Sequence, residues 1–252
     1  MLEWLTIKQL EAYHYGQFLV MIDGAPLAIG LGWAVIIYSS MEFSERIELP
    51  DSARAILDAL LALNIDMALD AVAIRLGMWT WSNVGPDQQW FGVPWVNFWA
   101  WFIVVWSYSG FVRALRDWRG YRVRGWLYVP LAVLFSLVFL LATSELYRSL
   151  INSLGNGALG PLILIGGSIV LILGGQPRVL HSGPPEGLIV AIPVIFHAMA
   201  AIAGFRYGIY AQVPALAAVG IAMSVIGLAV HLWPWWGALY RPRPEAVGKD
   251  AP

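Results

Sequence analysis

Two aspartates lie four residues apart in an otherwise apolar stretch, LNIDMALDAVAI at residues 63–74. On an α-helix, Asp66 and Asp70 are about 40° apart and project from one face. An ionised carboxylate near a bilayer centre costs roughly 2.5 to 3.5 kcal/mol, so this face must meet the protein interior or a wet cavity. Neighbouring carboxyl groups in such a medium titrate as a coupled pair, and one of them can keep its proton at neutral pH. The pair is therefore suited to acid–base chemistry, and a polar network that joins helices is the structural alternative.

Other polar side chains lie in or beside the neighbouring apolar runs. Asp23 and Glu42 lie in and at the end of the first run, Asn97 lies in the third, and Arg75 follows the aspartate pair by about one helical turn. The sequence does not show which of these groups converge on the carboxyl pair.

The composition is that of an integral membrane protein. Of the 252 residues, 59% are apolar and 12% are charged, about half the ~25% charged residues of soluble domains. The net charge of −1 gives no basic field for nucleic acid. The chain has no cysteine, which excludes disulfides, thiolate metal sites and cysteine nucleophiles. Nucleophile elbows, phosphate loops and zinc signatures of soluble enzymes are also absent from the sequence.

Long apolar runs joined by short connections predict an all-α, multi-pass helical bundle in the cell membrane. We expect one transmembrane domain over residues 1–241 and a disordered polar tail over residues 242–252. The first run is longer than the core of a signal peptide, so it should remain as a spanning helix. No internal repeat is evident. The seven predicted spans are 18–41, 55–79, 93–112, 126–146, 158–175, 187–206 and 213–234.

Basic residues predict the orientation of this bundle. The connection RALRDWRGYRVRG at residues 113–125 carries five arginines, which places it in the cytoplasm. Alternating the spans from that anchor puts the N-terminus outside and the C-terminus inside, with 11 of the 15 basic residues inside. The basic residues then predicted outside are Lys8, Arg148 and Arg206, with Arg75 inside a span.

A tryptophan-rich segment, WTWSNVGPDQQWFGVPWVNFWAW, follows at residues 79–101. An interfacial aromatic belt is the structural interpretation of such a segment. The segment continues into the third span around Asn97, however, and tryptophan faces can stabilise a cation. Gly92 and Pro94 are suited to shaping the passage from loop to helix.

The two segments together resemble the multi-pass carotenoid biosynthesis membrane family that includes the bisanhydrobacterioruberin hydratases. The resemblance covers roughly residues 60–105. It departs from the family pattern at Ala71, where a proline is expected, and at Trp90-Phe91, where a tyrosine pair is expected; an upstream glutamate motif is reduced to Glu42. The residues that carry the resemblance are Asp66, Asp70, Trp79, Trp81, Gly92, Val93, Pro94, Asn97, Phe98 and Trp101.

This resemblance implies the addition of water to a terminal C=C bond of a linear carotenoid. One aspartate would protonate the alkene, the other would act as base, and Asn97 would orient water. Such chemistry requires neither a redox cofactor nor a metal. The substrate-binding residues expected around the catalytic Asp66, Asp70 and Asn97 are Trp79, Trp81, Trp101, Phe98, Asp23 and Glu42.

Other functions remain open at this stage. NIDMALD resembles one aspartate-rich motif of intramembrane prenyltransferases, although the second such motif is absent from the sequence. A proton-coupled carrier could use Asp23, Asp66 and Asp70 as a relay. A pigment-binding subunit could use His197 or His231 as an axial ligand. A retinal protein is excluded, since the only lysines, Lys8 and Lys249, lie outside the predicted spans.

Overall fold

The computed structural model describes residues 13–82, 85, 88–116, 125–180 and 187–240. The helices in this part of the chain are α2 (Leu27–Ser44), α3 (Asp51–Arg75), α4 (Trp95–Arg116), α6 (Tyr128–Leu154), α7 (Leu159–Gly174), α8 (Gly187–Arg206), the short α9 (Ile209–Gln212) and α10 (Pro214–Tyr240), with a 3-10 turn η2 (Gly125–Leu127). The strands are β1 (Tyr13–Tyr15), β2 (Met21–Ile22), β3 (Ala25–Pro26), β4 (Ile47–Glu48), β5 (Trp79–Trp81), β6 (Gln89–Trp90), β7 (Val93–Pro94) and β8 (Arg178–Val179). The predicted tail, residues 242–252, lies outside the described residues.

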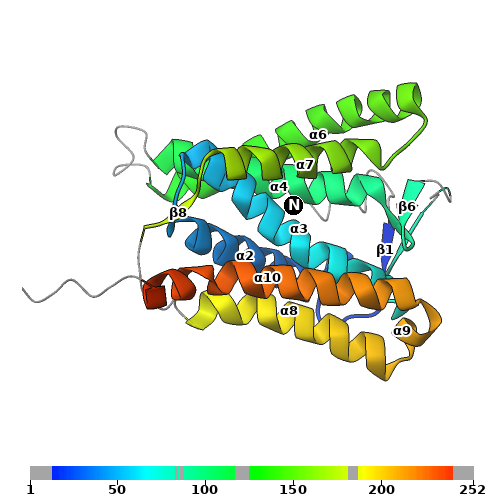
Figure 1. The fold of residues 1–252 in the computed structure, drawn as a ribbon. Coiled ribbons are helices and arrows are strands. Elements are labelled where there is room, and N and C mark those ends of the chain that lie inside the picture. Colours follow the sequence, from blue (N-terminus) through cyan, green and yellow to red (C-terminus); the bar gives the residue numbers. More distant parts are fainter. Residues whose placement is uncertain (1–12, 83–84, 86–87, 117–124, 181–186, 241–252) are drawn as a thin grey trace, which may run out of the picture.

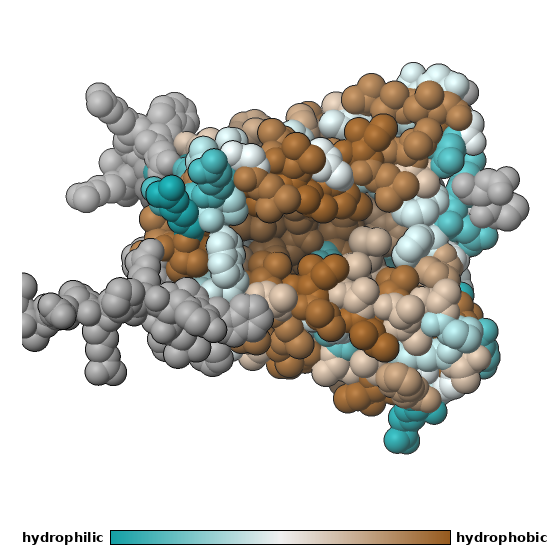
Figure 2. Space-filling view, viewed as in Figure 1, coloured by the Kyte–Doolittle hydropathy of each residue, from teal (hydrophilic) through white to brown (hydrophobic). Residues whose placement is uncertain are grey.

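The all-α membrane class is confirmed. In the described part of the chain, five helices are long and apolar enough to cross a bilayer: α2, α4, α8, and the greater parts of α6 and α10. The other two predicted windows also contain helices, but α7 has only 16 residues and the acidic residues of α3 lower its hydropathy. On the face shown in Figure 2, hydrophobic side chains cover most of the middle and hydrophilic ones gather toward the two ends. The count of seven spans and their orientation remain predictions.

Helix α3 is the central element of the bundle. It packs against α2, α4, α7, α8 and α10, and in Figure 1 it crosses between a layer of α6 and α7 and a layer of α8 and α10. A helix surrounded in this way can keep acidic side chains away from lipid. This position explains how α3 can carry Asp58, Asp66 and Asp70, all of which are buried.

The two ends of the bundle differ in sequence and structure. At one end, β4 pairs with β8 and the Leu180 amide donates to the Arg46 carbonyl at 2.8 Å. This end also gathers Arg54, Arg113 and Arg116 around Glu45. At the other end, β1 pairs with β5, and each of the hairpins β2–β3 and β6–β7 leads into a helix. The described basic residues assigned to one side by the sequence therefore do share one end of the bundle.

The start of the first predicted span is wrong. The structure places Asp23 and Gly24 in the tight turn between β2 and β3, with φ of 48° and 87°. Pro26 then precedes α2, whose first residue is Leu27. Hydropathy extended the span back to residue 18 because the hairpin residues are apolar, although Asp-Gly is a strong signal for this type of turn. Asp23 is consequently an exposed turn residue outside the helix.

The structure also reveals a short internal repeat that the sequence alone did not make evident. A second hairpin, β6–β7, has the same two-residue turn, with φ of 47° at Phe91 and 89° at Gly92. Each hairpin ends in a proline and is followed directly by a long helix. With an offset of 68 residues, IDGAPLAIGLGW at 22–33 aligns with WFGVPWVNFWAW at 90–101, sharing only the glycine, proline and tryptophan at matching positions.

Candidate active site

The three predicted catalytic residues form one cluster between α3 and α4. The Asn97 amide nitrogen donates to Asp66 Oδ2 at 3.1 Å and to Asp70 Oδ2 at 2.7 Å. All three side chains are buried, with 0%, 4% and 8% of the surface exposed for Asp66, Asp70 and Asn97. The predicted same-face arrangement of the aspartates is therefore present, and the third span supplies the amide that joins them.

The cluster places two acidic groups close together in a medium of low polarity. Since both accept from one nitrogen, the two Oδ2 atoms are separated by about 6 Å at most. Two full negative charges at that distance repel by roughly 3 kcal/mol at an effective dielectric constant of about 20. The other oxygen of Asp66, Oδ1, is buried and has no hydrogen-bond partner in the described part of the chain. A proton shared by the carboxyl pair would remove much of this repulsion.

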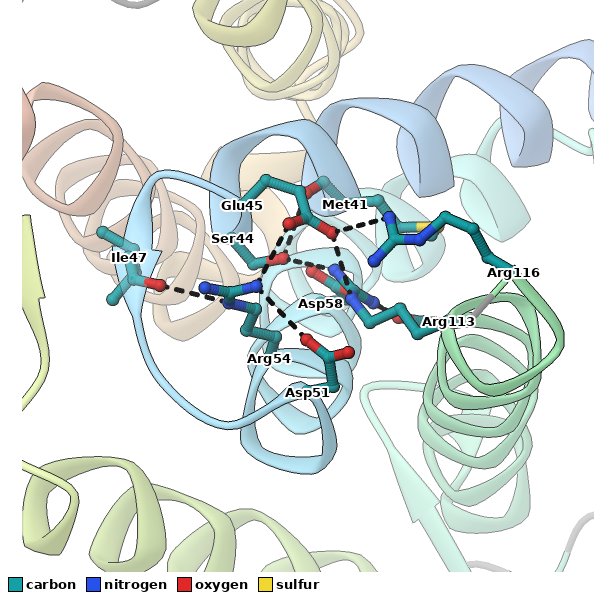
Figure 3. A network of polar contacts seen from close by, with 10 residues as sticks. Met41, Ser44, Glu45, Ile47, Asp51, Arg54, Asp58, Arg113 and Arg116 are labelled. Carbon is teal, nitrogen blue, oxygen red and sulfur yellow. Dashed lines mark hydrogen bonds and ion pairs between the residues drawn. The ribbon is translucent and has the colours of Figure 1, made fainter. Parts of the chain in front are cut away.

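A second buried polar cluster occupies the same helix interface, nearer the arginine-rich end (Figure 3). Arg113 of α4 donates to Asp58 Oδ2 of α3 at 2.7 Å, and Ser109 contacts both side chains. Arg113 also donates to Ser44 Oγ at 2.8 Å and to Glu45 Oε1 at 3.3 Å. We refer to Asp58, Ser109 and Arg113 with Ser44 and Glu45 as the arginine cluster.

The two clusters lie on one seam, the interface between α3 and α4. Asn97, Ser109 and Arg113 lie at multiples of four residues along α4, and Asp58, Asp66 and Asp70 do so along α3. Each step of four residues turns only about 40° around the helix axis, so neighbouring members of each set stay near this interface. Apolar residues separate the clusters, including Ala62 and Val105, both fully buried. One polar seam therefore holds a carboxyl–amide cluster and a charge-paired cluster.

The arginine cluster corrects one interpretation of the sequence. The sequence assigned Arg113 to a cytoplasmic connection that served topology, whereas the structure places it within α4 with 1% of its surface exposed. Arg119, Arg122 and Arg124, which belong to the same predicted connection, lie outside the described residues.

Two predicted substrate-binding residues lie away from the carboxyl–amide cluster. Asp23 is in the β2–β3 turn, and Glu42 is an exposed residue in the last turn of α2, next to the arginine cluster. Arg75 donates to the carbonyls of Ala71 and Phe91, at 2.7 and 2.8 Å, and so ties the end of α3 to the second hairpin.

The predicted aromatic residues separate into two groups. Trp79 and Trp81 belong to β5 and make edge contacts with Tyr15 and Tyr13 of β1. Together with Arg75, Phe91 and Gly92 they line an open depression of about 660 Å³ at that end of the bundle.

The second aromatic group belongs to α4. Phe98 is buried against Trp95 at 5.7 Å. Trp101 lies one turn after Asn97 and stacks on Trp33 of α2, with ring centroids 3.9 Å apart. Trp33 was not predicted as a site residue, because nothing in its own surroundings in the sequence distinguishes it.

The opposite side of α3 carries a third polar contact that the sequence did not predict. Asn64 Oδ1 lies 3.0 Å from His197 Nε2 of α8, and its amide donates to the Met223 carbonyl of α10 at 3.1 Å. His197 Nδ1 is buried and has no partner in the described part of the chain. His231 Nδ1 lies 2.7 Å from the Gly227 carbonyl, one turn earlier in α10. Asn64 therefore joins α3 to the C-terminal helices.

Within the described residues, no three histidine, cysteine or acidic side chains are grouped so as to hold a metal ion.

Comparison with known proteins gives one finding. Residues 10–164 match the model of a family described as carotenoid biosynthesis protein. No curated protein and no solved structure gives a match. The matched range contains the carboxyl–amide cluster, the arginine cluster and both hairpins.

Proposed function

The chain belongs to the carotenoid biosynthesis protein family, and from this premise we propose that it is a membrane hydratase that adds water to a terminal C=C bond of a linear carotenoid. A wholly apolar polyene dissolves in the bilayer, so a reactive group buried between membrane helices suits it. The proposed product is a tertiary alcohol at the end of the chain.

The observation that carries the proposal is the difference between two fully buried aspartates of one helix. Asp58 has the guanidinium of Arg113 at 2.7 Å. Asp66 forms no ion pair among the described residues; its partner there is the neutral amide of Asn97, and Asp70 lies one turn away. Buried charges are ordinarily paired. An aspartate with an amide and a second carboxyl group as its surroundings is better suited to hold a proton, and a buried protonated acid can protonate an alkene.

The proposed reaction needs only the alkene, one water and the two aspartates. The protonated aspartate transfers H⁺ to the less substituted carbon of the alkene, and the π electrons form the new C–H bond. A tertiary cation remains on the other carbon. Water donates an electron pair to that carbon and loses H⁺ to the carboxylate of the second aspartate. The pair then holds one proton again, which returns across the short distance between Asp66 and Asp70 before the next turnover.

Asn97 and Trp101 have supporting roles in this proposal. The Asn97 amide fixes the two carboxyl groups relative to each other, and its carbonyl oxygen can accept a hydrogen bond from the attacking water. Trp101 lies one turn along α4, where an indole face would stabilise the cation. Trp79 and Trp81 line the depression beyond the end of α3 and would contact another part of a long substrate.

Expression in a bacterial strain that accumulates lycopene tests the proposal directly. The extracted pigments are separated by chromatography and their masses are measured. We expect a more polar pigment heavier by one water. Unchanged pigments, with the protein confirmed in the membrane and with both C40 and C50 acyclic carotenoids supplied, would contradict hydration and favour the carrier or pigment-binding interpretation.

A further inference from the structure

The repeated hairpin–helix unit brings two equivalent tryptophans into contact. Trp33 and Trp101 are each the seventh residue after the proline that ends a hairpin, and their rings stack at 3.9 Å with an interplanar angle of 23°. The strands before the hairpins are also in contact. β1 and β5 pair antiparallel, with Tyr13 opposite Trp81, its equivalent at the same offset of 68 residues, and Tyr15 opposite Trp79. The two units therefore contact each other both at these strands and at the tryptophan pair.

The units are equivalent in backbone but not in chemistry. The second unit carries Asn97, which binds both carboxyl groups, whereas the first has Ile29 at the matching position. The contact thus joins a unit that contributes Asn97 to the carboxyl–amide cluster with one that contributes Trp33 to the tryptophan pair. Since Trp101 follows Asn97 by one turn, the Trp33–Trp101 pair lies on the α2 side of the cluster.

The tryptophan pair also bridges two helices at the border of the core. α2 and α4 both pack along α3, and the indoles of Trp33 and Trp101 close the space between them. Both rings are half-buried, so each keeps part of its surface outside the core. On the same face of α2 as Trp33, one turn to either side, Gly30 is exposed and Ile37 is half-buried. The approach to the pair from the bilayer is therefore apolar.

We propose that the Trp33–Trp101 pair marks the lateral access and binding site through which a linear isoprenoid passes from the bilayer, between α2 and α4, to the carboxyl–amide cluster. The proposal rests on the proposed function. A rigid polyene has flat apolar faces that stack on indole, and it cannot easily cross the charged end of the bundle. Separation of the two rings would open a path that ends beside Asn97. Trp33 is then a substrate-contacting residue of the first unit.

Cross-linking tests this path, because the natural chain has no cysteine. The double variant Trp33→Cys/Trp101→Cys is linked in membranes with a short methanethiosulfonate reagent that a reductant cleaves. We expect linkage to reduce hydration at least tenfold and reduction to restore the activity of the unlinked variant. The matched control is Glu48→Cys/Arg178→Cys, which links β4 and β8 at the opposite end of the bundle and should leave activity within twofold. Full activity of the linked Trp33→Cys/Trp101→Cys protein would overturn the proposal.

A second measurement needs no turnover. In an Asp66→Asn background, Trp33→Cys is labelled with a membrane-permeant maleimide in vesicles with and without lycopene. We expect lycopene to slow labelling several-fold, while labelling of Val225→Cys on the exposed side of α10 stays unchanged. Equal labelling of the Trp33→Cys variant in both kinds of vesicle would contradict the access site even if the double variant is inactive. Protection without any hydration by the natural chain would retain the access site and contradict the proposed reaction instead.

Discussion

The two buried clusters on the α3–α4 seam differ in how their charge is balanced. In the arginine cluster, Asp58 and Arg113 have 0% and 1% of their surface exposed and form a direct ion pair. In the carboxyl–amide cluster, Asp66 is as deeply buried, but Asn97 is neutral. Both clusters lie between the same two helices. Asp58 and Asp66 are eight residues apart on α3, which corresponds to about 12 Å along the helix axis. The two clusters therefore differ in the residues that contact their aspartates, and not in how deeply those aspartates are buried.

This difference separates a structural use of a buried acid from a chemical one. The ion pair with Arg113 favours the ionised form of Asp58 and holds α3, α4 and the end of α2 together. The amide of Asn97 fixes the positions of Asp66 and Asp70 without fixing their charge. A group that must give and take a proton needs the second arrangement. The arginine cluster also sets the register of α3 against α4, which places Asn97 between the two aspartates.

The largest loss of hydration activity is expected when one acid of the carboxyl–amide cluster is replaced. Asp66→Asn and Asp70→Asn should each lower hydration by about 100-fold to 10,000-fold, because a general acid or base is lost. The neutral amide is nearly isosteric with the acid, so the variants should fold. Product formed per unit of membrane protein in the lycopene strain measures the effect.

Asp58→Asn is the matched control for that prediction. It makes the same chemical change in the same helix and should lower the amount of folded protein while leaving the activity of the folded fraction within about threefold. Loss of catalysis in Asp58→Asn, with Asp66→Asn and Asp70→Asn fully active, would reverse the roles assigned to the two clusters.

The ion pair between Asp58 and Arg113 should contribute to the stability of the fold. Arg113→Met leaves Asp58 buried without its cation, which should cost about 3 to 5 kcal/mol of stability. Adding Asp58→Leu should recover most of that loss, since a well-packed apolar pair can replace a buried ion pair. Thermal unfolding of the purified proteins in one detergent measures both changes. Equal stability of Arg113→Met and the natural chain would show that the ion pair has no structural role.

The sequence indicated one side of this contrast, the carboxyl–amide cluster, and not the other. Asp66 and Asp70 could be singled out because acids are rare within apolar runs and because four-residue spacing puts them on a common face, whereas Asn97 was singled out through the family resemblance. The role of Arg113 could not be predicted, since its partner lies 55 residues earlier and a basic residue at the end of a span also fits the topology rule. Asp58 was noted only for lowering the hydropathy of the second span.

The geometry of the two hairpin turns accounts for the remaining differences between the predicted and the observed structure. Asp23 was placed in a span because hydropathy averages over the residues of a window, whereas the backbone follows the Asp-Gly turn and Pro26. The repeat was missed because the two units share few side chains, while their turn conformations and strand pairing agree residue by residue. Trp33 could have been found by aligning the two Gly-x-Pro segments and following each to its seventh residue after proline.

A smaller loss of hydration activity is expected when Asn97, the neutral member of the carboxyl–amide cluster, is replaced. Asn97→Ala removes a hydrogen-bond donor from two buried acids, worth about 1 to 3 kcal/mol, and should lower hydration about tenfold. Ser109→Ala is the matched change in the arginine cluster and should leave activity within about twofold. The same pigment assay with both variants measures the difference. Equal activity of Asn97→Ala and the natural chain would limit Asn97 to packing.

The smallest expected effect lies on the opposite side of α3, where Asn64 bonds His197. His197→Leu leaves the Asn64 carbonyl without this partner and should cost about 1 to 2 kcal/mol of stability, seen as a lower unfolding temperature in detergent. Hydration should stay within about twofold, because Asn64 faces α8 and α10 whereas Asp66 and Asp70 face α4. His197→Gln, which can still bond Asn64, should recover part of the stability. A large loss of hydration in His197→Leu at unchanged stability would extend the reactive site beyond the α3–α4 seam and bring the C-terminal helices into the chemistry.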